Sequence, residues 1–159
     1  MSLDTASKPT EHNSYSALTV WRVVDGRSYL EFAWRDRVDY PTLKRRVTGF
    51  AEVLHPEVLL IEDKVAGTGL IQDLQEEGRF PVVPYEPHGD KESRMRWQAA
   101  KIEAGQVFLP REASWLADFE DEVRQFPGGK HNDQVDSMSQ ALDQINWRSP
   151  ELILTTYRS

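Results

Sequence analysis

A short apolar run that ends in two acidic residues is the feature that most constrains how this chain can fold. Residues 58–61 (Val-Leu-Leu-Ile) are apolar without alternation, which is typical of a strand buried on both faces of a mostly parallel sheet. Glu62 and Asp63 follow directly, and a Gly-x-Gly turn then leads into a helical pattern. Ligands of open α/β sheets bind beyond the carboxyl ends of the strands, where these acids are expected. Because side chains alternate across a strand, we expect only one acid to be functional, and the alternative is a solvated strand end.

The patterns on either side of this run predict a mixed α/β domain. Residues 4–34 favour two or three antiparallel strands joined by an Asp25-Gly26 hairpin turn. Asp39 is a good N-cap for a helix that ends near His55, with Leu54 among its inward-facing residues. Further helices are expected at 69–77, 90–104, 115–126 and from 133 onward, and short strands at 82–83 and 107–110. This order implies right-handed parallel crossovers.

Composition favours one soluble globular domain over residues 1–159, with 39% hydrophobic and 28% charged residues. No apolar run approaches membrane-spanning length, and the absence of cysteine excludes disulfides and fits a reducing compartment. The net charge of −7 argues against a simple electrostatic nucleic-acid binder, although carboxylates that bind cations would be partly neutralised. Residues 1–3 resemble an added leader, and no role is assigned to the tail 147–159, which contains a strand-like run at 152–154.

Three acids on separate elements point to metal chemistry. Asp4 precedes the first long strand, Glu62 ends the central strand and Asp133 begins the last helix. Converging carboxylates repel one another and usually require a cation, and an oxygen-only ligand set suits Mg²⁺ or Mn²⁺. Two such ions can activate a water and stabilise the leaving oxygen in phosphodiester cleavage. Spacing alone does not prove that these acids converge.

Four motifs, in this order, resemble a known family. They are Asp4-Thr5-Ala6-Ser7-Lys8-Pro9, Leu60-Ile61-Glu62-Asp63-Lys64-Val65-Ala66-Gly67, Asp90-Lys91-x-x-Arg94-Met95 and Phe126-Pro127-Gly128-Gly129-Lys130-His131-Asn132-Asp133-Gln134-Val135-Asp136. Together they resemble the C-terminal nuclease domain of the terminase large subunit of tailed bacteriophages and prophages, over residues 4–146. The resemblance implies a ribonuclease H-like fold with a central mixed sheet flanked by helices, antiparallel in its early strands and parallel in its later ones. It also implies cleavage of concatemeric double-stranded DNA by two metal ions during genome packaging.

The resemblance assigns roles to the acidic residues. Asp4 would be the bridging carboxylate and Asp133 the helix-borne acid, and both would bind the two Mg²⁺ or Mn²⁺ ions with Glu62. Glu62 is preferred over Asp63 because the family's acid directly follows the apolar run, at the spacing seen to the glycine. Asp136, one turn after Asp133, is either an auxiliary ligand or a helix-surface acid.

The same resemblance suggests roles for basic residues. Lys64 and Lys91 would steady phosphates or the leaving group, and the alternative is a pair of surface lysines in ion pairs. His131 would relay protons or serve only as a polar cap. We expect five basic residues to contact DNA: Lys44, Arg45, Lys91, Arg94 and Lys130. For Lys44 and Arg45 a solvated helix face is the alternative.

Two departures from the family pattern and one missing motif qualify these expectations. Asn132 stands where the family commonly has a first aspartate after the histidine, and only Leu3 precedes Asp4 as an apolar strand residue, so a truncated strand and a loosely held Asp4 are expected. No Gly-x-x-x-x-Gly-Lys-Ser/Thr phosphate loop is present, which predicts no ATPase activity in this chain.

The implied partners are double-stranded DNA, the terminase ATPase domain, the portal and the small terminase subunit, on a packaging motor in the bacterial cytoplasm and without a membrane. Two other functions stay open: a resolvase-like nuclease that acts on branched DNA, and a non-catalytic module of the same fold that binds DNA or the portal.

Overall fold

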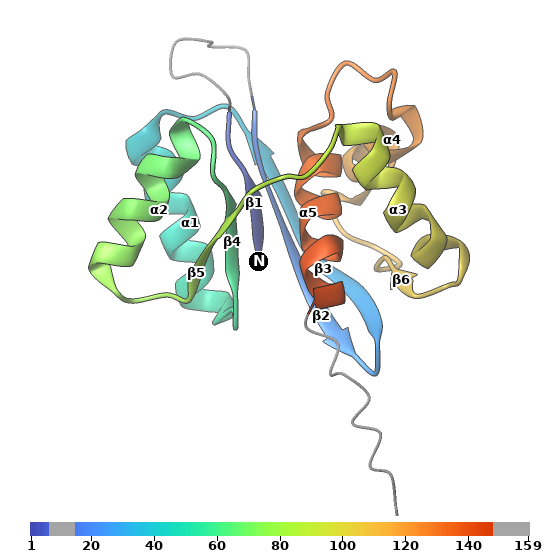
Figure 1. Cartoon of the computed structure of the whole chain (residues 1–159), viewed down its shortest axis with the longest axis horizontal. Coiled ribbons are helices and arrows are strands. Elements are labelled where there is room, and N and C mark those ends of the chain that lie inside the picture. Colours follow the sequence, from blue (N-terminus) through green and yellow to red (C-terminus); the bar gives the residue numbers. More distant parts are fainter. Residues whose placement is uncertain (7–14, 148–159) are drawn as a thin grey trace, which may run out of the picture.

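The computed structural model describes residues 1–6 and 15–147 and shows a central sheet with helices on both faces (Figure 1). The strands are β1 (Ser2–Asp4), β2 (Ser16–Val24), β3 (Arg27–Asp36), β4 (Leu59–Glu62), β5 (Val82–Tyr85) and β6 (Val107–Phe108). The helices are α1 (Tyr40–Leu54), α2 (Ala66–Glu77), α3 (Lys91–Glu103), α4 (Leu116–Gln125) and α5 (Asp133–Trp147). Among the described residues, no helix is both long and apolar enough to cross a membrane. The strand-like run at 152–154 lies outside these residues.

The sheet is mixed, with the strand order β5-β4-β1-β2-β3-β6. The β1–β2 and β2–β3 pairs are antiparallel, whereas β1–β4, β4–β5 and β3–β6 are parallel. This arrangement confirms the predicted combination of antiparallel early strands and parallel later strands. It also places the short strand β1 at the centre, between β2 and β4.

The first residues of the chain are an integral part of this sheet. Ser2 and Leu3 pair with both β2 and β4, and the amino group of Met1 donates to the Val58 carbonyl at 2.8 Å. Leu3 is fully buried and Asp4 is 7% exposed. The expectation that Asp4 would be loosely held is therefore wrong, because pairing on both sides of β1 compensates for its short length.

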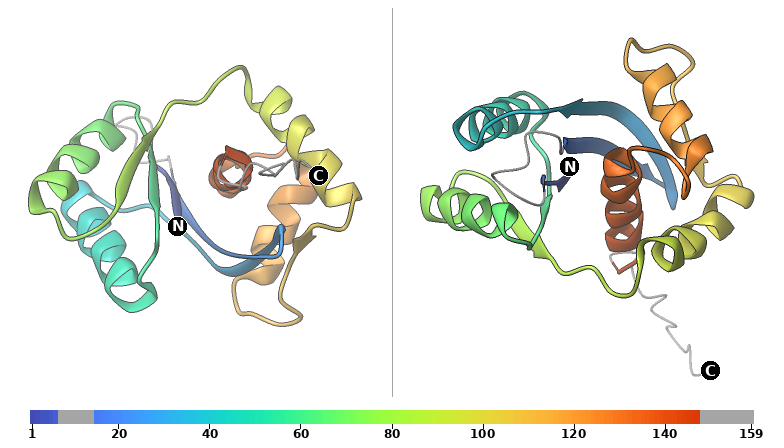
Figure 2. Two further views of the ribbon diagram at one scale, coloured as in Figure 1. Left: turned by 60° about the horizontal axis from the view of Figure 1, so that its bottom comes forward. Right: turned by 90° about the horizontal axis from the view of Figure 1, so that it is seen from above.

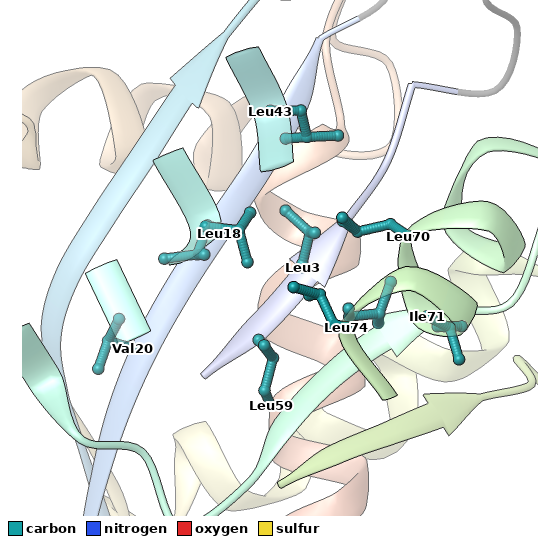
Figure 3. Packing of buried hydrophobic residues seen from close by; sticks show 10 residues of the cluster. Leu3, Leu18, Val20, Leu43, Leu59, Leu70, Ile71 and Leu74 are labelled. Atoms are coloured by element: carbon teal, nitrogen blue, oxygen red, sulfur yellow. The ribbon is translucent and has the colours of Figure 1, made fainter. Parts of the chain in front are cut away.

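Helices α1 and α2 cover one face of the sheet (Figure 2). Asp39 caps α1 by accepting from the Thr42 amide at 3.0 Å, and the inward stripe of α1 contains Leu43, Val47 and Ala51. Leu54 is 38% exposed rather than buried, because the helix ends beside it at His55, which adopts a left-handed conformation. Aliphatic side chains from both helices meet those of the sheet in one cluster (Figure 3): Leu3, Leu18, Val20, Leu43, Val47, Leu59, Ile61, Leu70, Ile71 and Leu74.

Helix α5 covers the other face, with α3 and α4 packed beside it (Figure 2). Its contact with the central strands is formed largely by small polar groups. The Ser137 hydroxyl lies 2.8 Å from that of Thr19 and donates to the Ser2 carbonyl at 2.8 Å, while the Ser2 hydroxyl donates to the Ser137 carbonyl at 2.8 Å. These bonds fix where α5 lies along β1, and therefore where its acidic first turn stands relative to Asp4.

Candidate active site

Asp4 and Glu62 lie side by side at the carboxyl ends of two neighbouring parallel strands. Ser2 is paired with Leu60 and Leu3 with Ile61, so the next step of the same register brings Asp4 to Glu62. Both side chains are buried, at 7% exposure each, and their carboxyl groups are hydrogen-bonded to each other. Two of the three acids that were predicted to converge, Asp4 and Glu62, therefore lie together.

The electrostatics of this pair are asymmetric. Burial, together with the hydrogen bond and negative charge of Glu62, raises the pKa of Asp4 well above its usual range. Burial acts in the same direction on Glu62, but hydrogen bonds from Asp4 and Lys64 outweigh it and lower the pKa of Glu62. Without a cation, Asp4 is thus the carboxyl of the pair that favours its protonated form, and Glu62 the one that favours its charged form. Such a pair is suited to exchange its proton for a metal ion.

The turn after β4 explains why Glu62, and not Asp63, faces Asp4. The Lys64 ammonium donates to Glu62 Oε1 at 2.6 Å, whereas Asp63 Oδ1 accepts from the Thr68 hydroxyl at 2.6 Å and so binds the first turn of α2. Gly67 makes this turn possible, because a Cβ atom there would lie 1.9 Å from the Glu62 carbonyl oxygen. Only glycine allows α2 to begin so close to the end of the strand.

Asp136 is a third buried acid beside this pair. Its negative charge contributes to raising the pKa of Asp4. It forms ion pairs with Lys91 and with Arg94, the latter at 3.2 Å. Burial nevertheless raises the pKa of Asp136. Lys91 is the counterpart: burial alone would lower its pKa, but the hydrogen bond and charge of Asp136 outweigh that effect and raise it.

Asp133 is a partly buried acid in the first turn of α5. The charges that act most strongly on it are those of Glu122, Lys91 and His131, and burial is the main cause of its raised pKa. It is not among the groups whose charges act most strongly on Asp4 or Glu62. The charge of Asp136, rather than that of Asp133, is therefore among the main influences on the pKa of Asp4.

The donor atoms of this centre fit a hard divalent cation in chemistry. Asp4, Glu62 and Asp136 offer only carboxylate oxygens, which Mg²⁺ and Mn²⁺ prefer. In the described residues, however, no group of three or more acidic or histidine side chains is arranged as a ready metal site. The ion pairs explain this, because Lys91 and Arg94 occupy the oxygens of Asp136. Asp136 would offer a third carboxylate to a cation that took the place of Lys91.

With this geometry established, comparison with known proteins identifies the family. A model of the terminase RNase H-like domain matches residues 1–144. The chain belongs to this family. A search of curated protein sequences found no match.

Solved structures agree with the terminase nuclease fold. The magnesium-bound large terminase nuclease of thermophilic phage G20c has a TM-score of 0.69 and 19% identity, over 90% of this chain and 79% of that one. Its cobalt-bound form has a TM-score of 0.68 and 19% identity, over 87% and 79% of the two chains. The resolvase of fowlpox virus, in complex with Holliday junction DNA, has a TM-score of 0.53 and 14% identity, over 92% and 97%. At these identities the likeness shows that the ribonuclease H-like fold is shared.

A buried glutamate that was missed in the sequence orients the acidic helix of this terminase domain. Glu122 of α4 accepts hydrogen bonds from the backbone amides of Gln134 at 2.6 Å and Val135 at 3.3 Å, in the first turn of α5. It also accepts from the Gln134 side chain at 2.9 Å and from Arg35 at 2.5 Å. Glu122 thus supplies the helix cap from another element, and no local pattern around α5 signals it.

The five residues expected to contact DNA lie in three different places. Lys91 and Lys130 line one pocket, together with His131 and Asp133. Arg94 is buried against Asp136 and does not lie on the surface. On α1, which covers the opposite face of the sheet, Lys44 forms ion pairs with Asp73 at 2.9 Å and Glu77 at 2.8 Å, and Arg45 is exposed beside Thr42.

Proposed function

We propose that this domain is a metal-dependent endodeoxyribonuclease that cuts both strands of concatemeric DNA during phage genome packaging. The observation that carries the proposal is the hydrogen-bonded pair of Asp4 and Glu62, buried at the carboxyl ends of adjacent strands with Asp136 beside it. Membership of the terminase RNase H-like family supports it, as does the magnesium bound by the terminase nuclease of phage G20c. By family, its partners are the terminase ATPase domain, the portal and the small subunit in the host cytoplasm.

The acids would hold two divalent cations, Mg²⁺ or Mn²⁺. Asp4 and Glu62 form the core of the ligand set, and the helix α5 contributes Asp136 or Asp133. When bound, the cations supply an activated water and stabilise the leaving oxygen of the scissile phosphodiester. The proton that Asp4 retains leaves as cations bind, because neighbouring positive charge favours the ionised carboxylate.

The chain's own basic residues orient these acids and the substrate. Lys64 holds Glu62 through a hydrogen bond of 2.6 Å, which restricts the rotation of the carboxylate. Arg94 holds one oxygen of Asp136 from inside the protein. Lys91, whose side chain is 52% exposed, leaves Asp136 and binds a phosphate oxygen of the DNA strand. Lysine suits this exchange because its ammonium is a compact charge on a flexible stem.

A resolvase-like function on branched DNA is the second candidate, supported by the likeness to the fowlpox virus resolvase. The two functions differ in substrate preference rather than in chemistry. Faster cleavage of a four-way junction than of linear duplex, at equal concentrations of DNA, would favour the resolvase.

The decisive experiment is cleavage of supercoiled plasmid by the purified domain with Mn²⁺ or Mg²⁺. We expect nicked and linear products from the wild type, and a loss of at least about 100-fold in Glu62→Ala, because a metal ligand is removed. Asp63→Ala is the matched control. This neighbouring acid accepts a hydrogen bond from Thr68, so the variant should retain most of the activity. Asp133→Ala and Asp136→Ala, measured side by side, show which acid of α5 is the third ligand.

Full activity of Glu62→Ala would contradict the site assignment. DNA binding without cleavage, in a wild type whose chain is extended before Asp4, would favour the non-catalytic binding module.

A further inference from the structure

Two arginines lie over one tyrosine ring near the buried acids Asp4, Glu62 and Asp136, which together are called the acid centre below. The guanidinium carbon of Arg35 is 4.7 Å from the centre of the Tyr15 ring, and that of Arg37 is 4.3 Å away. The edge of the same ring meets His131 at a centroid distance of 4.9 Å, with the rings 84° apart. Residues from the start of β2, the end of β3 and the loop before α5 are thereby joined. The Tyr15 ring supports both guanidinium groups without neutralising their charge.

The two arginines differ in what binds their charge. Arg35 is partly buried, with a side-chain exposure of 21%, and forms an ion pair with the buried Glu122 at 2.5 Å. Its positive charge is therefore compensated inside the protein. Arg37 is exposed, and within the described ranges 1–6 and 15–147 it forms no ion pair. Among the residues that the structure describes, no carboxylate occupies its guanidinium.

Arg37 opens into a polar pocket that adjoins the buried acids through Lys91. The pocket has a volume of about 550 Å³ and is lined by Tyr15, Arg37, Lys91, Lys130, His131, Asn132 and Asp133. Three of these residues are cations and only one is an acid, in a chain whose net charge is −7. Lys91 belongs both to the pocket and to the ion pair with Asp136. An anion in this pocket therefore lies next to the candidate cleavage centre.

We propose that Arg37, supported by Tyr15 and accompanied by Lys130, binds a backbone phosphate of the DNA strand that enters the acid centre. The inference rests on the proposed nuclease function and adds a positioning residue to it. A guanidinium group matches phosphate because its planar N–H fork can donate two parallel hydrogen bonds. The ring beneath Arg37 restricts its motion, so less entropy is lost when the phosphate binds. Arg35 cannot take this role, since Glu122 already accepts from it.

The test is DNA binding in EDTA, measured by fluorescence anisotropy with a labelled linear duplex over a series of salt concentrations. We expect Arg37→Gln to weaken binding about tenfold at low salt and to lower the slope of log K against log salt by about one. Arg22→Gln is the matched control. Arg22 is also exposed and lies near the β2–β3 hairpin, where it pairs with Glu31, so neither affinity nor slope should change.

A second variant separates a phosphate contact from a folding defect. Arg37→Lys keeps the charge but loses the fork, so the salt slope should return to the wild-type value while binding stays weaker. Unchanged affinity and slope in Arg37→Gln would overturn the proposal, as would equal losses in Arg22→Gln or no binding by the wild type.

This experiment is independent of catalysis. If the wild type cleaves plasmid and Arg37→Gln binds DNA as tightly as the wild type, only the inference about Arg37 is refuted. If Arg37→Gln alone loses DNA binding but the wild type does not cleave plasmid, the phosphate contact is supported and the proposed nuclease function is refuted.

Discussion

The two faces of the sheet differ in their buried contacts with the helices that cover them. On the face covered by α1 and α2, aliphatic side chains such as Leu18, Leu70 and Leu74 exclude water by packing alone. On the face covered by α5, Ser2, Thr19 and Ser137 are buried and bonded to one another. Apolar burial stabilises a fold without regard to direction, whereas buried hydrogen bonds are lost if either partner shifts. The α5 face also has an apolar cluster (Leu30, Ala33, Phe119, Met138 and Leu142), so both faces contribute to stability, but only the α5 face adds buried hydrogen bonds that set the position of the acids.

Truncating a residue of the apolar face should have the largest effect on stability and little effect on chemistry. Leu74 is fully buried in α2, so Leu74→Ala should cost about 3 kcal/mol of unfolding free energy. Plasmid cleavage well below the melting temperature should remain near that of the wild type. Denaturant unfolding measures the first quantity, and Val53→Ala on α1, 77% exposed, is the control. A cost below about 1 kcal/mol would show that the two faces do not differ in this way.

A change on the polar face should affect both properties. Glu122→Gln leaves Arg35 without its carboxylate and weakens the cap of α5, at a cost of about 2 kcal/mol. Cleavage should also fall, by about tenfold, because the first turn of α5 carries Asp133 and Asp136. Asp121→Asn is the control on the same helix, since the Asp121 side chain is 66% exposed. A variant that loses stability but keeps full activity would limit Glu122 to a structural role.

The smallest change in the free energy of unfolding is expected for Asp4→Asn, and it should be an increase. Asp4→Asn should abolish cleavage yet stabilise the metal-free protein at pH 7 to 8 by about 1 kcal/mol, because the wild-type carboxyl must be protonated or buried as a charge on folding, whereas the amide is neutral in both states. The pKa of Asp4 is raised in the folded state, so its contribution is fully present below about pH 4 and is lost as the pH rises through the folded value.

Melting temperatures in EDTA between pH 4 and 8 test this predicted pH dependence of the contribution of Asp4 to stability. The wild type should lose more stability than Asp4→Asn as the pH rises, and added Mg²⁺ should reverse the difference. Parallel pH profiles of the two proteins would contradict it.

Local patterns in the sequence predicted the apolar face better than the polar one. The stripe of Leu43, Val47 and Ala51 follows from helical spacing, and the Asp39 cap of α1 follows from a short-range rule. The contact of Asp4 with Glu62 agrees with the motifs, because both acids end neighbouring parallel strands.

What could not be predicted depends on helix packing across long stretches of chain. Arg94 reaches Asp136 over 42 residues, and Glu122 caps α5 from α4 although its neighbours indicate a solvated helix face. Periodicity says which side of a helix is apolar, but not which buried charge its polar residues will meet. For the same reason, the spacing of Asp133 and Asp136 showed that they share a face, but not that the charge of Asp136 acts on Asp4.

The hydroxyl bonds between Ser2 and Ser137 join residues that are 135 positions apart in the chain. When this domain is synthesised on the ribosome, β1 emerges before the other described elements and α5 emerges after them. The partners of Asp4 on α5 are therefore made only after nearly all of the other elements. Contacts of such long range also form slowly, because a large loop must close first. The proposed nuclease therefore cannot assemble its cutting centre on a partly made chain, and a nascent polypeptide is unable to damage DNA until α5 has docked.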